Sequence, residues 1–211
     1  MTAEPIESPS LSPAGYGVAE LLYLLGCYDT PSTRRSADAL MVQWPSSSED
    51  LRVAGTSSLL ARQQLKVEGD ELVPTGLALA LAYALGNANR WTSASFLSDD
   101  GTQAAVFIHA PDLAAFLQPR GLGGWFAQIQ MPSSSIAETL ATLAAEHCSR
   151  AANAKVVFSS TDGSSAHNVI LRTSGDRWEA ALSRGDERAV PLAGTLNLAE
   201  VEALLNEQLL G

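Results

Sequence analysis

Histidine and cysteine are the residues of this sequence best suited to metal binding or nucleophilic catalysis, and their spacing supports neither role. His109, His147 and His167 fall on separate segments, and none has a second ligand at His-x-x-x-His or Cys-x-x-Cys spacing. His147 is followed directly by Cys148, but neighbouring side chains on a helix point about 100° apart. We therefore expect structural histidines and no metal site.

The two cysteines, Cys27 and Cys148, are far apart in the chain and do not form the spacing of a disulfide framework. We expect two reduced and mostly buried thiols.

Glycine- and serine-rich segments also lack the residues that would make them catalytic. GLGGW, from Gly121 to Trp125, has no Lys-Ser/Thr ending and no clear following helix, so it does not fit a phosphate loop. The serine runs contain neither Gly-x-Ser-x-Gly nor Ser-x-x-Lys. Asp99 and Asp100 are typical of a solvated turn. The sequence therefore predicts no enzyme and no cofactor. An enzyme whose catalytic site is assembled from residues distant in sequence is the alternative that we rank last.

The same glycine turn offers a different kind of site. Arg120, Leu122, Trp125 and Phe126 could place guanidinium and aromatic groups at a loop tip, and these residue types anchor protein interfaces. We predict partner binding by these four residues. Packing of Trp125 and Phe126 in the core is the alternative.

Hydrophobic periodicity predicts helices in the N-terminal part, after an acidic, Pro- and Ser-rich tail at residues 1–13. Helices are expected from Tyr16 to Leu25, from Ser36 to Trp44, and from the end of the Pro45–Asp50 loop to about Arg62. A hairpin around Gly69-Asp70 and a helix ending near Gly86 follow. This order predicts a winged-helix-like subdomain at residues 14–90.

After Arg90 the pattern changes to short strands. Strands are expected at 91–97, 103–109 and 125–131, with a helix at 134–151; residues 110–117 fit either a strand or a helix. Strands starting at 155, 167 and 177 and a helix at 198–210 repeat this plan. We predict an α+β fold that forms one compact domain overall, with two quasi-repeats at 91–151 and 155–211. The strands should pair antiparallel, because the connections between them are too short for crossovers. Helices are expected on one face of the sheet. Whether the two groups of strands form one sheet or two is left open by the sequence.

Charge argues against nucleic acid as a partner. The 211 residues carry 23 acidic and 13 basic side chains, a net charge of −10, whereas a nucleic-acid binder needs a positive surface. The hairpin from Gln64 to Thr75 has three acids and one base. The rival hypothesis is a winged-helix transcriptional regulator with an α+β ligand-sensing or dimerisation half. It requires a basic face made from the four arginines Arg34, Arg35, Arg52 and Arg62.

No targeting or membrane segment is predicted. Val18 to Cys27 ends in Leu-Leu-Gly-Cys, like a lipoprotein cleavage box, but Glu20 interrupts the apolar run and no basic residue precedes it. No stretch has the 18 apolar residues of a spanning helix. We expect a cytoplasmic protein with a protein partner; a homodimer would suit the strand edges.

The order of segments resembles the EspG-type chaperones of actinobacterial ESX (type VII) secretion over residues 49–211. The resemblance rests on LLARQQL (59–65), GDELVP (69–74), LALALAYAL (77–85), WTSASFLSDDGTQAAVFIHA (91–110) and the segment NVILRTSGDRW to NEQL (168–209). It implies a non-enzymatic chaperone that holds the helical tip of a secreted protein pair. The chain is shorter than typical members, and residues 1–48 show no counterpart of the family's opening strand.

Overall fold

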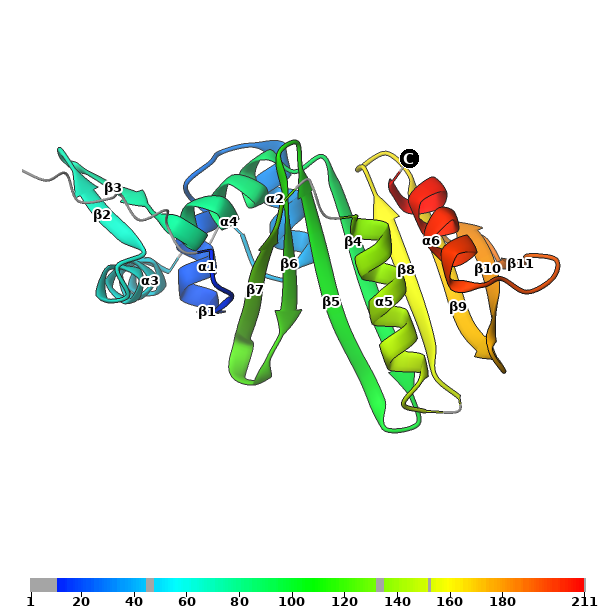
Figure 1. Cartoon of the computed structure of the whole chain (residues 1–211). Helices are drawn as coiled ribbons and strands as arrows, with labels where there is room; N and C mark the ends of the chain where they lie inside the picture. The colour runs from blue at the N-terminus through cyan, green and yellow to red at the C-terminus, as the bar shows by residue number, and fades with distance from the viewer. Residues whose placement is uncertain (1–10, 45–47, 132–134, 152, 211) are drawn as a thin grey trace, which may run out of the picture.

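The backbone forms one large antiparallel sheet with helices packed on it. The computed structural model describes residues 11–44, 48–131, 135–151 and 153–210. In the sheet the strand order is β1-β7-β6-β5-β4-β8-β9-β10-β11, and β2 and β3 form a separate hairpin (Figure 1). The strands are β1 (Ala14–Gly17), β2 (Leu65–Glu68), β3 (Glu71–Pro74), β4 (Arg90–Ser98), β5 (Gly101–Ala110), β6 (Leu113–Pro119), β7 (Gly124–Gln130), β8 (Lys155–Thr161), β9 (Ala166–Ser174), β10 (Arg177–Arg184) and β11 (Val190–Pro191).

The helices fall into an N-terminal group and two later ones. They are α1 (Val18–Leu25), α2 (Pro31–Ala39), α3 (Glu49–Ala61), α4 (Gly76–Asn87), α5 (Ile136–Cys148) and α6 (Leu198–Leu205), with a 3-10 turn η1 (Gly121–Gly123) and a π-helical turn η2 (Asn206–Leu210). The mixed helix and sheet architecture predicted from the sequence is confirmed at this level. The β4–β8 pair joins the two groups of strands, so they form a single sheet.

Helices cover both faces of the sheet, so the prediction that they lie on one face is wrong. On β5, Val106 and Ile108 belong to a core shared with α1, α2 and α4, whereas Ala105 and Phe107 belong to a second core shared with α5 and α6. Successive residues of a strand point to opposite faces. The unbroken apolar run in β5 therefore reflects burial on both sides, as Figure 1 illustrates with α5 lying along the sheet.

The segment predicted as a helix from Tyr16 begins as a strand. Ala14–Gly17 pairs antiparallel with β7, with Tyr16 opposite Trp125. Helix α1 starts only at Val18, where the Glu20 carboxylate accepts a hydrogen bond from the Gly17 backbone N–H at 2.7 Å. The opening strand that the sequence did not reveal is therefore present. Four residues are too few for a periodic signal, and its pairing partner lies more than 100 residues later in the sequence.

The second helix is also placed differently. A helix was expected from Ser36 to Trp44, after a turn, but α2 runs from Pro31 to Ala39. The Thr30 side chain accepts a hydrogen bond from the Thr33 N–H at 3.2 Å, and Pro31 occupies the first turn, where a missing N–H leaves no bond unmade. The residues expected to form a turn, Thr30 to Thr33, are therefore the N-cap and first turn of α2.

The winged-helix description of residues 14–90 is not confirmed. A hairpin does lie between α3 and α4, but the helices do not form a bundle of their own. Leu81 and Leu85 of α4 share a core with Leu117 of β6 and Trp125 of β7. The helices are thus a layer on the large sheet, and α3 and the hairpin project at one end of the molecule (Figure 1).

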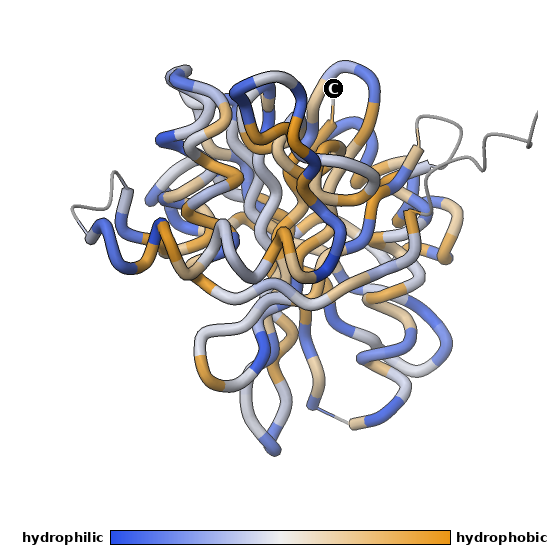
Figure 2. Tube along the Cα trace, turned by 90° about the vertical axis from the view of Figure 1, so that its left-hand side faces the viewer, coloured by the Kyte–Doolittle hydropathy of each residue, from blue (hydrophilic) through white to orange (hydrophobic). Residues whose placement is uncertain are grey.

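The ambiguous segment after Ala110 is strand β6, paired with β5 and β7. Cys148 is buried, as expected, but Cys27 is exposed. Figure 2, viewed from the end that carries α3 and the hairpin, shows hydrophobic segments in the interior and hydrophilic residues at several outer loop ends. No helix within the described ranges is long and apolar enough to cross a membrane.

Candidate functional site

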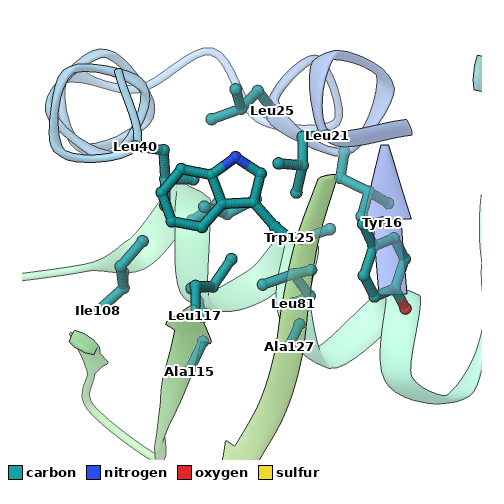
Figure 3. Close-up of a cluster of buried hydrophobic side chains, with 14 of the residues drawn as sticks. Tyr16, Leu21, Leu25, Leu40, Leu81, Ile108, Ala115, Leu117, Trp125 and Ala127 are labelled. Carbon is teal, nitrogen blue, oxygen red and sulfur yellow. The ribbon is translucent and has the colours of Figure 1, made fainter. Parts of the chain in front are cut away.

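The four residues predicted to bind a partner do not share one environment. Trp125 is 6% exposed and belongs to the core. Figure 3 shows its indole among Leu21, Leu25, Leu40 and Leu117. It comes from β7 and lies beneath the helix layer, so its placement indicates a structural role.

The other three residues lie at the surface, at the tip between β6 and β7. The Arg120 guanidinium carbon is 5.5 Å from the centre of the Phe126 ring, and Phe126 is partly exposed. Leu122 is fully exposed and has a φ of 60°, which is an unusual backbone conformation for a residue with a side chain. Their role in partner binding stays a prediction.

A larger apolar site lies at the other end of α1. A cavity of about 470 Å³, here called the groove, opens between α1, the segment after it, the start of α3, strand β3 and helix α4. Ligand sites typically span ~300–1,000 Å³. Its lining is mainly apolar and aromatic: Leu22, Tyr23, Gly26, Cys27, Tyr28, Trp44, Ser48, Arg52, Leu72, Val73, Pro74, Leu79 and Ala82.

Hydrogen bonds between distant segments hold the walls of the groove in place. The Tyr23 hydroxyl donates to the Leu72 carbonyl at 3.1 Å, which ties α1 to the hairpin. The Thr30 hydroxyl donates to the Gly86 carbonyl at 2.6 Å, which ties the segment after α1 to the end of α4. Burial, followed by the nearby Cys27, raises the pKa of Tyr23, so its hydroxyl keeps its proton at neutral pH.

Two glycines allow the aromatic residues of the groove to approach the backbone. A Cβ on Gly86 would lie 2.5 Å from the Tyr28 Cβ, and a Cβ on Gly26 would lie 3.3 Å from the Trp44 ring. The aromatic rings therefore pack directly on helix ends. This arrangement makes a preformed apolar surface, which loses little side-chain freedom on binding.

A partly buried ion pair anchors α3, which carries part of the groove, to α1. The Glu20 side chain is 7% exposed, and its carboxylate accepts hydrogen bonds from the Ser58 hydroxyl at 2.8 Å and from the Arg62 guanidinium at 2.7 Å. Arg62 also lies over the Tyr16 ring, 5.2 Å from its centre. Burial raises the pKa of Tyr16 to about 12, so this side chain stays neutral beneath the ion pair.

The arginines proposed as a DNA-binding face are largely engaged within the chain. Arg62 is paired with Glu20, and Arg52 makes hydrogen bonds of 2.6 to 3.0 Å with the Glu49 carboxylate. Arg35 lies over the Trp91 ring and donates to the carbonyls of residues 162 and 163 at 3.3 Å. Of these four arginines, only Arg34 makes no ion pair, hydrogen bond or ring contact of this kind within the described residues. The arrangement does not present a continuous basic surface.

The histidines have structural contacts. The buried His109 shares a hydrogen bond of 3.0 Å with the Thr92 hydroxyl, and His147 pairs with the Leu97 carbonyl at 3.0 Å. Burial, followed by the charge of Arg90, lowers the pKa of His109 to about 4. Across the described ranges, no group of three or more His, Cys, Asp or Glu side chains could hold a metal ion.

A second cavity of similar volume lies on β9, β10 and β11. It contains Lys155 and the ion pair between Arg172 and Glu179. Its charged lining makes it a poorer site for apolar ligands than the groove.

Sequence patterns did not reveal the groove. Its lining comes from residues between 22 and 82 that lie on four elements and two connecting segments. Six of the eleven large apolar side chains that are exposed in the described part of the chain fall between residues 41 and 79: Met41, Leu51, Val53, Leu60, Val67 and Leu79. A sequence cannot distinguish these from buried positions, since the same residue types fill the core.

Comparison with known proteins gives a match in fold but none in sequence. No protein-family model and no curated protein matches the sequence. The chain is similar to the solved structure of the Mycobacterium tuberculosis type VII secretion system chaperone EspG5 in complex with the PE25–PPE41 dimer. The TM-score is 0.59 at 9% identity, and the match covers 95% of this chain and 98% of that chain. The chain is therefore similar to that chaperone in fold, which confirms the predicted resemblance at the level of the fold alone.

Proposed function

We propose that this chain is a non-enzymatic chaperone or adaptor, acting in the cytoplasm, whose groove holds an apolar helical segment of a partner protein. The observation that carries the proposal is the groove itself, an open apolar cavity of about 470 Å³ lined by Tyr23, Tyr28 and Trp44. Apolar helices commonly bind in such grooves through side chains spaced three or four residues apart. The likeness in fold to a chaperone that was solved with a protein dimer supports a protein partner.

The size of the groove suits a few large side chains. Burial of one Leu- or Phe-sized side chain contributes ~1.5–3 kcal/mol, so three of them would offset part of the cost of association. A partner helix with such residues exposed would otherwise aggregate. Holding it in the groove before export by a type VII secretion route would keep it soluble.

The first experiment is affinity capture from the cytosol of the source organism, followed by binding measurements with the purified partner. Leu79 of α4 lines the groove and is 45% exposed. Leu79→Gln places an amide where the partner's apolar side chains would bury it, so we expect affinity to fall roughly tenfold.

Leu198 supplies a matched control. It is 46% exposed at the start of α6, in a different part of the chain. Leu198→Gln should leave affinity unchanged. Equal affinity of wild type and Leu79→Gln would refute binding in the groove, and salt-sensitive retention on DNA, lost on replacing Arg34, would favour the regulator hypothesis.

A further inference from the structure

We infer that the partner segment held by the groove is flanked by lysine or arginine residues, because exposed carboxylates, here called the rim, neighbour the lining residues in the chain. This inference rests on the proposed function and adds a chemical requirement for the partner.

Carboxylates follow or precede lining residues on three different segments. Asp29 follows Tyr28, Asp50 lies between Ser48 and Arg52, and Glu71 precedes Leu72. The hairpin adds Glu68, directly opposite Glu71 in the β2–β3 register, and Asp70 in the turn between them. The hairpin and α3 project at the same end of the molecule (Figure 1).

The basic residues of this rim do not balance its acids. Residues 22–29, 48–52 and 66–74 contain six carboxylates and two cations, a net charge of −4. Both cations are already paired, Arg52 with Glu49 and Lys66 with Glu68. Of the six carboxylates, Glu49 and Glu68 are the partners of these two cations. The other four, Asp29, Asp50, Asp70 and Glu71, make no ion pair within the described part of the chain.

The four unpaired carboxylates are exposed, so their charge acts on whatever approaches the groove. Glu71 lies opposite Glu68 in the hairpin register, and Glu68 is already paired with Lys66. Glu71 is therefore the carboxylate of the two that is left for a cationic partner. Exposed charges at an interface rim act mainly on the association rate and on the choice of partner, while the apolar contacts set the residence time.

The test uses two synthetic helical peptides of 18 residues with the same Leu/Phe face, one flanked by lysines and the other by glutamates. Both carry the same dye, and binding to the full chain is followed by fluorescence anisotropy at 50 and 300 mM NaCl. We expect the lysine peptide to bind at least tenfold tighter at the lower salt. The preference should shrink at the higher salt, where screening shortens the range of exposed charges.

Charge reversal separates the rim from the overall charge of the protein. Asp29→Lys, Asp70→Lys and Glu71→Lys, combined in one variant, should weaken the lysine peptide by about threefold or more. The control variant combines Asp176→Lys, Asp186→Lys and Glu187→Lys. It changes net charge equally at distant turns, one of which is also a Gly-Asp turn between two strands, and should change affinity by less than about twofold.

Each result decides between the rim and the groove. Equal binding of both peptides, lost in Leu79→Gln, would keep the groove and overturn the requirement for a basic partner. A preference for lysine that both reversals reduce alike would assign it to the net charge and also overturn the inference. Binding of neither peptide would overturn the inference, whereas capture of a native partner whose binding depends on Leu79 would still support the proposed function.

Discussion

The Glu20 ion pair gives the sharpest test of how α1 and α3 are held together. Glu20→Ala removes a carboxylate that accepts hydrogen bonds from the Gly17 N–H, the Ser58 hydroxyl and the Arg62 guanidinium at 2.7 to 2.8 Å. The Glu20 side chain is 7% exposed and that of Arg62 is 35% exposed. The contribution of Glu20 should therefore exceed that of a surface ion pair.

The magnitude follows from the three contacts. The bond to the Gly17 N–H caps α1, and such a cap contributes ~1 kcal/mol. A hydrogen bond from a neutral group to a buried charge contributes at least ~1.5 kcal/mol. The pair with Arg62 counts as ~0.5 kcal/mol, because one partner is a third exposed and can be hydrated once released. The free energy of unfolding should fall by about 3 kcal/mol in Glu20→Ala.

Urea unfolding at pH 7, followed by tryptophan fluorescence, measures this difference. Glu49→Ala is the matched control, because the Glu49–Arg52 pair has side chains 66% and 69% exposed and should contribute roughly 0.5 kcal/mol or less. Similar losses in the two variants would refute the argument from burial. Glu20→Gln should lie between them, since the amide oxygen can still accept from the Gly17 N–H.

Two more predictions concern the same helix layer and the core of the sheet. A Cβ on Gly55 would lie 2.1 Å from the Ala19 carbonyl oxygen, so Gly55→Ala must push α3 away from α1; we expect a loss of about 2 kcal/mol in urea unfolding, whereas Ser57→Ala on the exposed side should change little. The second concerns His109, whose pKa of about 4 lies below its usual 6.5. Between pH 6.5 and 4 the imidazole of His109 is protonated in the unfolded chain but stays neutral in the folded chain. The folded state therefore loses on the order of 3 kcal/mol of stability as the pH falls from 6.5 to 4. Urea unfolding between pH 7 and 4 should show a flatter profile for His109→Asn, and equal slopes would refute a buried neutral imidazole.

Several elements could be predicted from the sequence because their signals are local. The helix at Ile136–Cys148 has an N-cap serine, Ser135, whose hydroxyl accepts from the Glu138 N–H at 3.1 Å, and an apolar face. The hairpin around Gly69 has a residue with φ of 63°, which favours glycine. These signals act over a few residues, so they can be recognised without knowing the fold.

Pairing between distant segments could not be predicted in the same way. The strand at Ala14–Gly17 is too short to show a pattern, and it exists because β7 supplies hydrogen bonds from residues 124–127. Trp125 illustrates the same limit for the site, because the types of residue that anchor an interface also fill a core. The division at residues 90 and 91 and the two quasi-repeats remain predictions.

The sequence by itself determined the class of fold, the order of most helices and strands, and an acidic surface poorly suited to nucleic acid. Capping, turn preference, periodicity and net charge are properties of neighbouring residues or of composition. Only the tertiary structure decided which apolar residues face inward, that helices cover both sides of one sheet, and that Tyr23, Tyr28 and Trp44 meet across a groove. The physical reason is that burial depends on contacts between segments far apart in the chain, and those contacts exist only once the sheet has paired.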